Sequence, residues 1–227
     1  MSHLVAIYGS PRRKGNTASL LSNAVQGARE EGCRVAEYVL RDLNISPCLE
    51  IYNCKKDGEC SIKDDFQTIR DDILQSSGVM LASPIFFYAV TAHTKMFMDR
   101  FQSLWVKKYW IDKIPFGKWT PRRKCLFISA AATSAKKLVD GALFTMKYFW
   151  GTLDMQMWNS LLYRGLDGPK DVQEYSEYLQ EKKQTFEQES ENYSPSEEIK
   201  AKKQIENANT LFNELMVRRR KKILNLV

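Results

Sequence analysis

Several features that would assign this chain to a membrane or secretory class are missing from its 227 residues. It contains no apolar run of 18 residues, so we expect no helix that spans a bilayer. A strand-like pattern begins by Leu4 without a charged and then apolar leader, so we expect no secretory signal. The five cysteines then indicate a reducing, cytoplasmic location and not a disulfide framework.

Charge and composition narrow the function classes further. With 44% hydrophobic residues the chain can build a sizeable core, and we expect one principal domain. The net charge of +7 could attract nucleic acid, but no recognition motif accompanies it. We therefore predict neither a nucleic-acid partner nor a membrane partner.

A strand, a loop and a helix start follow one another between residues 4 and 17. Leu4–Tyr8 is typical of a buried strand, residues 9–15 are rich in Gly and basic side chains, and a helical apolar pattern follows Asn16. The loop lacks the G-x-G-x-x-G of a dinucleotide fold. It also lacks the Lys-Ser/Thr pair that a nucleotide-triphosphate loop would place after Gly15.

Such a loop can bind a phosphate monoester without magnesium. The first turn of a helix offers unpaired N–H groups at a positive dipole end. Ser10, Asn16 and Thr17 add side-chain donors, and Arg12 can form a charge-assisted pair. The alternative is an ordinary solvated turn between strand and helix.

The following segments alternate between strand and helix patterns, which is the signature of a parallel α/β sheet. We predict a helix capped by Asp64 or Asp65 and one continuous helix over residues 91–105. The predicted strands are Leu4–Tyr8, Arg34–Leu40, Gly78–Ala82, Cys125–Ala130 and Met155–Tyr163.

Two further loops follow predicted strands, at the edge where ligands bind in open α/β sheets. The loop after the third strand carries Phe86, Phe87 and Tyr88, which suit a flat heteroaromatic ring. The alternative is that these rings pack beneath the next helix. Residues 129–134 carry small side chains that let the backbone approach a ligand closely.

Together, these motifs resemble a known family. Gly9–Arg12 with Gly15–Thr17 is similar to the FMN phosphate loop of the flavodoxin-like NAD(P)H-dependent FMN reductases and iron–sulfur flavoproteins. Residues 83–88 and Lys95–Arg100 match that family's S-P-x-(Y/F)-(F/W/Y) and K-x-F-(M/I)-D-R stretches. Over roughly residues 1–170 the resemblance implies a flavodoxin-like five-stranded parallel sheet, in the order 2-1-3-4-5, with helices on both faces.

The resemblance also implies FMN at the carboxyl ends of the strands, held by three loops. The predicted cofactor-binding residues are Ser10, Arg12, Gly15, Asn16, Thr17, Pro84, Ile85, Phe86, Phe87, Tyr88, Ser129, Ala130, Ala131 and Thr133. No acid–base residue stands out, so we predict no catalytic residue and no metal ligand. In this family the helix that matches residues 91–105 commonly lies at a subunit interface, which implies a homodimer or homotetramer.

Three cysteines, Cys48, Cys54 and Cys60, are spaced at equal five-residue gaps. Gathered thiolates can hold an iron–sulfur cluster, and the segment resembles the cysteine motif of the iron–sulfur flavoproteins. The fourth cysteine of that motif is replaced here by Ile51. We therefore predict no cluster; a labile three-cysteine cluster, a redox-active thiol pair and zinc remain alternatives. The resemblance places this loop beside the flavin.

The remaining segments carry weaker signals. Aromatic and basic residues alternate between Trp105 and Trp119, which suits a lid over a flavin or an interface. The basic residues 122–124 precede a strand at its amino end and are predicted to be solvated. From residue 171 to 227 polar residues dominate, and Ser194-Pro195 with Glu197 predicts a helix start in a C-terminal helical extension.

These observations predict an oxidoreductase with FMN as cofactor and NAD(P)H as co-substrate. Electrons would pass from the flavin to a free flavin, a quinone or another small acceptor, because the cofactor carries this chemistry and the protein orients it. One alternative is a flavin or iron–sulfur electron carrier that serves a protein partner. Another is a regulatory protein that keeps the fold without binding flavin.

Overall fold

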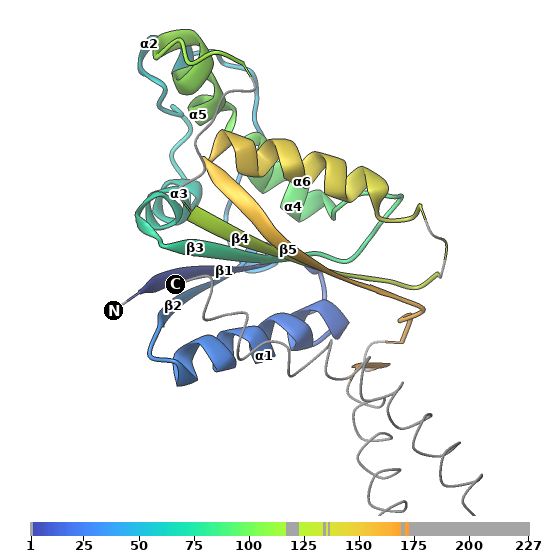
Figure 1. Cartoon of the computed structure of the whole chain (residues 1–227). Coiled ribbons are helices and arrows are strands. Elements are labelled where there is room, and N and C mark those ends of the chain that lie inside the picture. Colours follow the sequence, from blue (N-terminus) through green and yellow to red (C-terminus); the bar gives the residue numbers. More distant parts are fainter. Residues whose placement is uncertain (1, 117–122, 134, 136, 169–170, 173–227) are drawn as a thin grey trace, which may run out of the picture.

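The structure, a computed structural model, describes residues 2–116, 123–133, 135, 137–168 and 171–172. Trp119 and residues 173–227 of the predicted C-terminal helical extension lie outside these residues. A five-stranded parallel sheet in the order β2-β1-β3-β4-β5 forms the centre (Figure 1), which confirms the predicted flavodoxin-like order. The strands are β1 (His3–Tyr8), β2 (Arg34–Val39), β3 (Gly78–Ala82), β4 (Arg123–Ala131) and β5 (Met155–Arg164).

Helices cover both faces of the sheet. Figure 1 shows α1 (Asn16–Glu30) on one face and α3 (Phe66–Gln75), α4 (Ala92–Asp99) and α6 (Asp140–Thr152) on the other. Four shorter helices are η1 (Leu40–Asp42), α2 (Cys54–Asp57), α5 (Gln102–Val106) and the π-helical η2 (Lys107–Ile111). None of the described helices combines the length and apolarity that a bilayer crossing requires.

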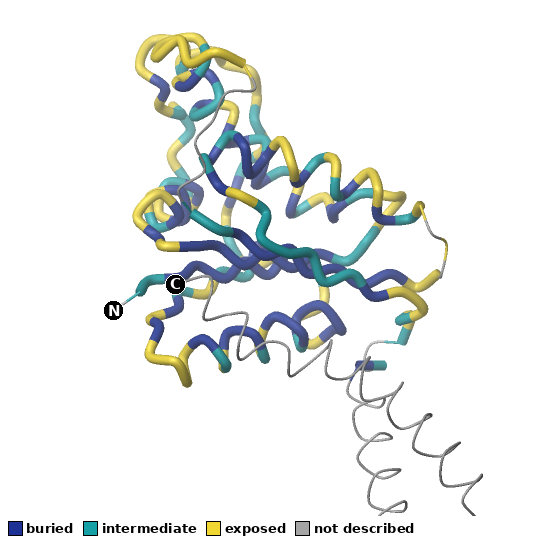
Figure 2. Tube along the Cα trace, viewed as in Figure 1, coloured by how far each residue is buried: buried dark blue, intermediate teal, exposed yellow. Residues whose placement is uncertain are grey.

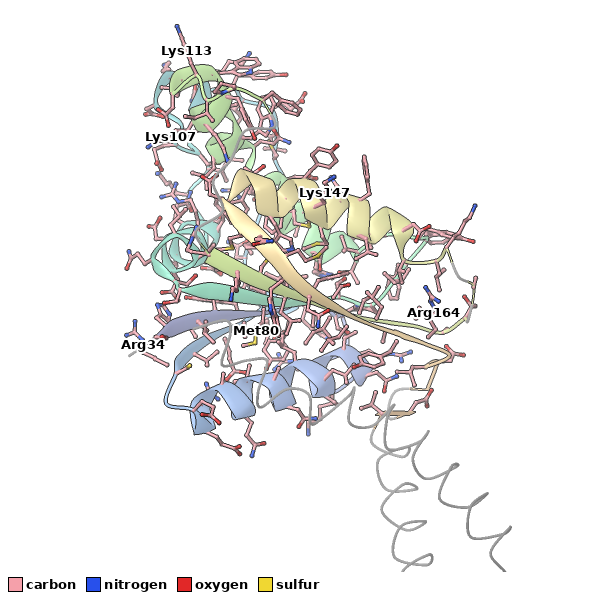
Figure 3. The ribbon with its side chains drawn as sticks, viewed as in Figure 1. Arg34, Met80, Lys107, Lys113, Lys147 and Arg164 are labelled. Carbon is pink, nitrogen blue, oxygen red and sulfur yellow. The ribbon has the colours of Figure 1, made fainter. Side chains whose placement is uncertain are left out.

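The core has two layers, one on each side of the sheet. Leu4, Ala6 and Met80 pack towards α1, whereas Val5 and Ile7 pack towards α3, α4 and α6. Figure 3 shows Met80 on the α1 side, and Figure 2 shows the central strands β1, β3 and β4 buried along most of their length. Burial on both faces explains why the segments Leu4–Tyr8, Gly78–Ala82 and Cys125–Ile128 are continuous apolar runs in the sequence.

The predicted continuous helix over residues 91–105 is wrong, because α4 ends at Asp99 and α5 begins at Gln102. Two consecutive residues at the break, Arg100 and Phe101, are both buried. Arg100 donates to Asp64 Oδ2 at 2.6 Å, while the ring of Phe101 lies 4.9 Å from that of Phe66. A regular helix separates neighbouring side chains by about 100°, so the break lets both point inward.

Two details at the ends of α3 refine the sequence predictions. Asp65 directly precedes the helix but makes no capping bond, and it is Asp64 Oδ1 that accepts from Phe66 N at 3.0 Å. The prediction that the basic residues before β4 are solvated is wrong for Arg123. Its guanidinium donates to the carbonyls of Ile73 and Leu153 at 2.6 and 2.9 Å, because the end of a helix leaves carbonyls to be satisfied. Arg122 lies outside the described residues.

Candidate flavin site

A cavity of about 130 Å³ lies where the carboxyl ends of β1, β3, β4 and β5 meet, and we call it the phosphate-loop cavity. It is smaller than the roughly 300–1,000 Å³ of a typical ligand pocket, so it can enclose only part of a flavin nucleotide. Its lining residues are Ser10, Pro11, Arg12, Gly15, Asn16, Thr17, Pro84, Ile85, Phe86, Ala130, Ala132, Leu166 and Asp167.

The phosphate loop, residues 9–15, turns from β1 into α1. Gly15 occupies the cap position of α1, which has no side-chain cap bond, so no side chain competes for the N–H groups of the first turn. Ser10 Oγ accepts from the backbone N–H of Arg12 at 3.1 Å, which closes the loop locally. This arrangement presents backbone donors and a positive dipole end to an anion.

Two neighbouring arginines in this loop lie in different surroundings. Arg12 lines the cavity and is the one cation among its lining residues. Arg13 points elsewhere, and its Nη2 lies 2.8 Å from Asp42 Oδ1 on an exposed surface. The structure therefore leaves Arg12 as the guanidinium available to a phosphate.

Asn16 lines the cavity, but most hydrogen-bonding groups of its side chain already bond to other residues of the chain. Its Nδ2 donates to Gly168 O at 2.8 Å, and its Oδ1 accepts from Val172 N at 3.2 Å. One amide N–H is left for a ligand. The principal role of this side chain in the structure is thus to hold the segment that follows β5, which contributes Leu166 and Asp167 to the cavity wall.

Residues 84–90 form a tight turn that we call the aromatic hairpin. Phe86 and Ala89 exchange backbone hydrogen bonds of 2.9 and 3.0 Å around Phe87 and Tyr88, which adopt φ values of 49° and 63°. Positive φ at two bulky residues is strained, and such strain persists where the surroundings hold it. A Cβ on Gly141 would come within 2.6 Å of Tyr88 O, so Gly141 permits this close packing.

The aromatic hairpin points its rings outward. Phe87 is 100% exposed, and Phe86 and Tyr88 are each at least half exposed. The alternative prediction, that these rings pack beneath the next helix, is therefore wrong. Phe86 lines the phosphate-loop cavity with Pro84 and Ile85, whereas Phe87 and Tyr88 lie beyond its wall.

The third predicted loop, after β4, contributes fewer residues to the cavity wall than expected. Ala130 lines the cavity, but Ser129 is fully buried and donates to Ser83 O at 2.7 Å. Ala131 accepts from Leu166 N at 3.0 Å, and Thr133 is exposed outside the cavity wall.

Four residues that line the cavity were missed by the sequence analysis: Pro11, Ala132, Leu166 and Asp167. Pro11 and Ala132 lie inside loops that had been assigned to the cofactor. Leu166 and Asp167 follow the last strand at its carboxyl end, and that position is the signal that could have found them.

Comparison with known proteins identifies the family to which these loops belong. The sequence model of the family described as NADPH-dependent FMN reductase matches residues 2–157. The chain belongs to this family. The expected FMN cofactor and NAD(P)H co-substrate are those of the NADPH-dependent FMN reductases.

Individual relatives match part of the chain. An iron–sulfur flavoprotein of Methanocaldococcus jannaschii is 38% identical over 101 residues, which are 44% of this chain and 52% of that protein. A putative NAD(P)H-dependent FMN-containing oxidoreductase of Bacillus subtilis is 29% identical over 97 residues, 43% of this chain and 50% of that protein. The chain thus spans about half the length of the curated relatives it matches.

Solved structures share the fold at low identity. The NAD(P)H:quinone oxidoreductase from Methanothermobacter marburgensis superposes with a TM-score of 0.59 and 16% identity, covering 77% of this chain and 90% of that one. The azoreductase AzrA gives a TM-score of 0.58 and 11% identity, covering 97% of this chain and 100% of that one. These similarities show that the chain shares the fold of these two proteins.

The iron–sulfur flavoproteins among these relatives prompt a test of the three cysteines. Cys48, Cys54 and Cys60 line a separate space of about 580 Å³, the cysteine cavity, which also contacts Trp105 and Trp110. It shares no lining residue with the phosphate-loop cavity. The position of this loop relative to the flavin therefore stays a prediction of the resemblance.

The residues of the cysteine cavity do not fit an iron–sulfur cluster. In the part of the chain that the structure describes, no three His, Cys, Asp or Glu side chains are placed to hold a metal ion. Ile51, at the position of the missing cysteine, is half exposed. Burial, together with the nearby Cys60 and Cys48, raises the pKa of the Cys54 thiol.

The aromatic and basic segment after α5 does not cover the phosphate-loop cavity. The rings of Trp105 and Tyr109 lie 5.3 Å apart, and Phe116 follows at 5.3 Å from Tyr109. Lys108 is buried and donates to Gly151 O at 2.8 Å, which holds this segment against the end of α6. The described part of the segment thus gives no lid over the flavin loops, and the interface alternative remains.

Proposed function

We propose that this chain is an FMN-dependent oxidoreductase that uses NAD(P)H and reduces a flavin, a quinone or another small acceptor. The observation that carries the proposal is the convergence of the phosphate loop and the aromatic hairpin on one cavity. Membership of the NADPH-dependent FMN reductase family supports it. The five cysteines, all free, are compatible with the reducing cytoplasm that we propose as its location.

The residues present fit the phosphate end of FMN. The uncapped first turn of α1 and the side chains of Ser10 and Thr17 would donate to the phosphate, and Arg12 would neutralise its charge. The exposed rings of the aromatic hairpin would contact the flat flavin ring outside the small cavity. When bound, FMN supplies the hydride and electron chemistry, and the chain binds, orients and shields it.

The test compares FMN with riboflavin, which has the same ring but no phosphate. Loss of a charge-assisted hydrogen bond costs about 1.5–3 kcal/mol, so Arg12→Ala should weaken FMN about 10- to 100-fold. Riboflavin affinity should change less than about twofold, because its contacts do not involve Arg12. Flavin fluorescence quenching on the flavin-free 227-residue chain measures both dissociation constants.

Arg13→Ala is the matched control, since it removes an equal charge one residue away. Arg13 pairs with Asp42 on the surface, so its loss should leave both flavins close to wild-type affinity. Equal weakening of FMN binding by the two substitutions would mean that Arg12 acts only through its long-range charge and does not contact the phosphate. A wild-type chain that binds neither flavin would overturn the proposed function.

A further inference from the structure

Four buried hydroxyl side chains lie between the start of the phosphate loop and the base of the aromatic hairpin, and we call them the hydroxyl cluster. Ser83, Thr91, Thr94 and Ser129 are each no more than 1% exposed. Ser83 follows β3, Thr91 and Thr94 lie at the start of α4, and Ser129 belongs to β4. None of them lines the cavity, so direct ligand contact does not explain them.

Thr91 and Thr94 both contact the start of the phosphate loop. Thr91 Oγ1 donates to Gly9 O at 2.5 Å, and Thr94 Oγ1 donates to the same carbonyl at 3.4 Å. The two hydroxyl oxygens lie 3.0 Å apart. A Cβ on Gly9 would lie 2.0 Å from Thr94 Oγ1, so only glycine allows the loop to lie this close to α4.

The same hydroxyl cluster continues to the base of the aromatic hairpin. Thr91 N donates to Ser83 Oγ at 3.0 Å, and Ser129 Oγ donates to Ser83 O at 2.7 Å. Ser83 directly precedes Pro84, the first residue of the aromatic hairpin. One buried hydrogen-bonded chain therefore connects the phosphate loop, α4 and the aromatic hairpin.

We propose that Thr91 and Thr94 are positioning residues that fix the phosphate loop relative to the aromatic hairpin. The inference rests on the proposed function, in which one FMN spans both loops. A ligand held at its phosphate by one loop and at its ring by the other is sensitive to the spacing between them. Riboflavin lacks the phosphate, so its affinity does not depend on where the phosphate loop lies.

The experiment measures dissociation constants for FMN and riboflavin in Thr91→Val and Thr94→Val. Each substitution keeps the side-chain shape and removes a hydroxyl, so FMN should bind about 5- to 10-fold more weakly while riboflavin changes less than about twofold. Thr91→Ser restores the hydroxyl and should return FMN affinity to near the wild-type value. Ser76→Ala removes a comparable buried bond, from Ser76 Oγ to Ile73 O, far from the site. This control should leave the ratio of the two affinities unchanged.

The outcomes separate the inference from the proposed function. Equal weakening of both flavins, or no weakening of either, in variants of a chain that binds FMN overturns only the positioning role. A wild-type chain that does not bind FMN overturns both proposals. Thr91 also caps α4, accepting from Thr94 N at 3.3 Å. If Thr91→Val fails to fold, the affinities measured with Thr94→Val test the inference. That variant retains the Thr91 cap, because the cap bond uses only the backbone N–H of residue 94.

Discussion

At the scale of single residues, the most informative contact in the interior is the ion pair between Asp64 and Arg100. Their side chains are 3% and 0% exposed, and Arg100 also lies over the Phe66 ring at 4.6 Å. Burial alone would raise the pKa of Asp64. The hydrogen bonds from Arg100 and from the N–H groups of Ser46 and Phe66 outweigh it and hold that pKa below its usual 3.8.

This pKa shift predicts how stability depends on pH. A carboxyl whose pKa is lowered in the folded state contributes stability above its unfolded pKa, and that stability is lost as the pH falls through the folded value. Near neutral pH, Asp64→Asn should cost about 3 kcal/mol or more, because it leaves Arg100 buried without its charge partner. The difference from wild type should begin to shrink below about pH 3.8, where Asp64 of the unfolded chain becomes protonated, and should disappear as the pH falls through the lower pKa of the folded state.

Urea unfolding followed by tryptophan fluorescence, at pH values from about 6 to about 3, measures this difference. Asp42→Asn serves as the control, since the pair of Asp42 with Arg13 is exposed and should contribute less than about 1 kcal/mol at any of these pH values. A penalty for Asp64→Asn that stays constant with pH would contradict the assignment of the lowered pKa to this pair.

Single residues also show which features of the site the sequence predicts and which it does not. Ser10, Arg12 and Thr17 were named for the phosphate, and all three line the cavity. The sequence could not distinguish Arg12 from Arg13, because the distinction depends on Asp42, which lies far along the chain. For the same reason it could not foresee that Asn16 bonds to Gly168 and Val172.

At the scale of elements, strands were predicted more accurately than helices. The third strand, Gly78–Ala82, was located without error, because a strand buried on both faces is a continuous apolar run bounded by polar residues. The break between α4 and α5 was not foreseen. It depends on Arg100 meeting Asp64, and local periodicity contains no information on that contact.

The separation of the cysteine cavity from the phosphate-loop cavity leads to a prediction about function. Replacing Cys48, Cys54 and Cys60 together with Ser should leave flavin reduction by NAD(P)H within about twofold of wild type, because none of them contacts the flavin loops. The measurement is steady-state reduction, with visible absorption and iron and sulfide assays on protein purified without oxygen.

The control for this triple variant is its thermal unfolding midpoint, which establishes that the fold persists. Flavin absorption bands without iron in the wild-type protein would support the prediction that these cysteines hold no cluster. Stoichiometric iron and sulfide in the wild type, lost together with activity in the variant, would show that three thiols do hold a cluster. Electron carriage would then become the leading function.

At the scale of the whole molecule, one face of the described part of the chain exposes apolar side chains. Phe144 on α6 is 63% exposed, with its ring 4.9 Å from that of Tyr148. Beside them, a groove of about 240 Å³ runs between α4, α5 and α6 and is lined by Phe101, Trp105 and Phe116. Contiguous exposed apolar surface of this kind marks an interaction site, and we propose that a second copy of the chain covers it.

This proposal predicts that a charge placed on the face weakens self-association. Tyr148→Glu should lower the mass measured by size-exclusion chromatography with light scattering from that of a dimer or tetramer towards that of a monomer, because burying an unpaired carboxylate is costly. Leu74→Glu is the control, since Leu74 is also exposed but lies on α3, away from α6. Unchanged mass in Tyr148→Glu, or an equal loss in both variants, would place the interface elsewhere.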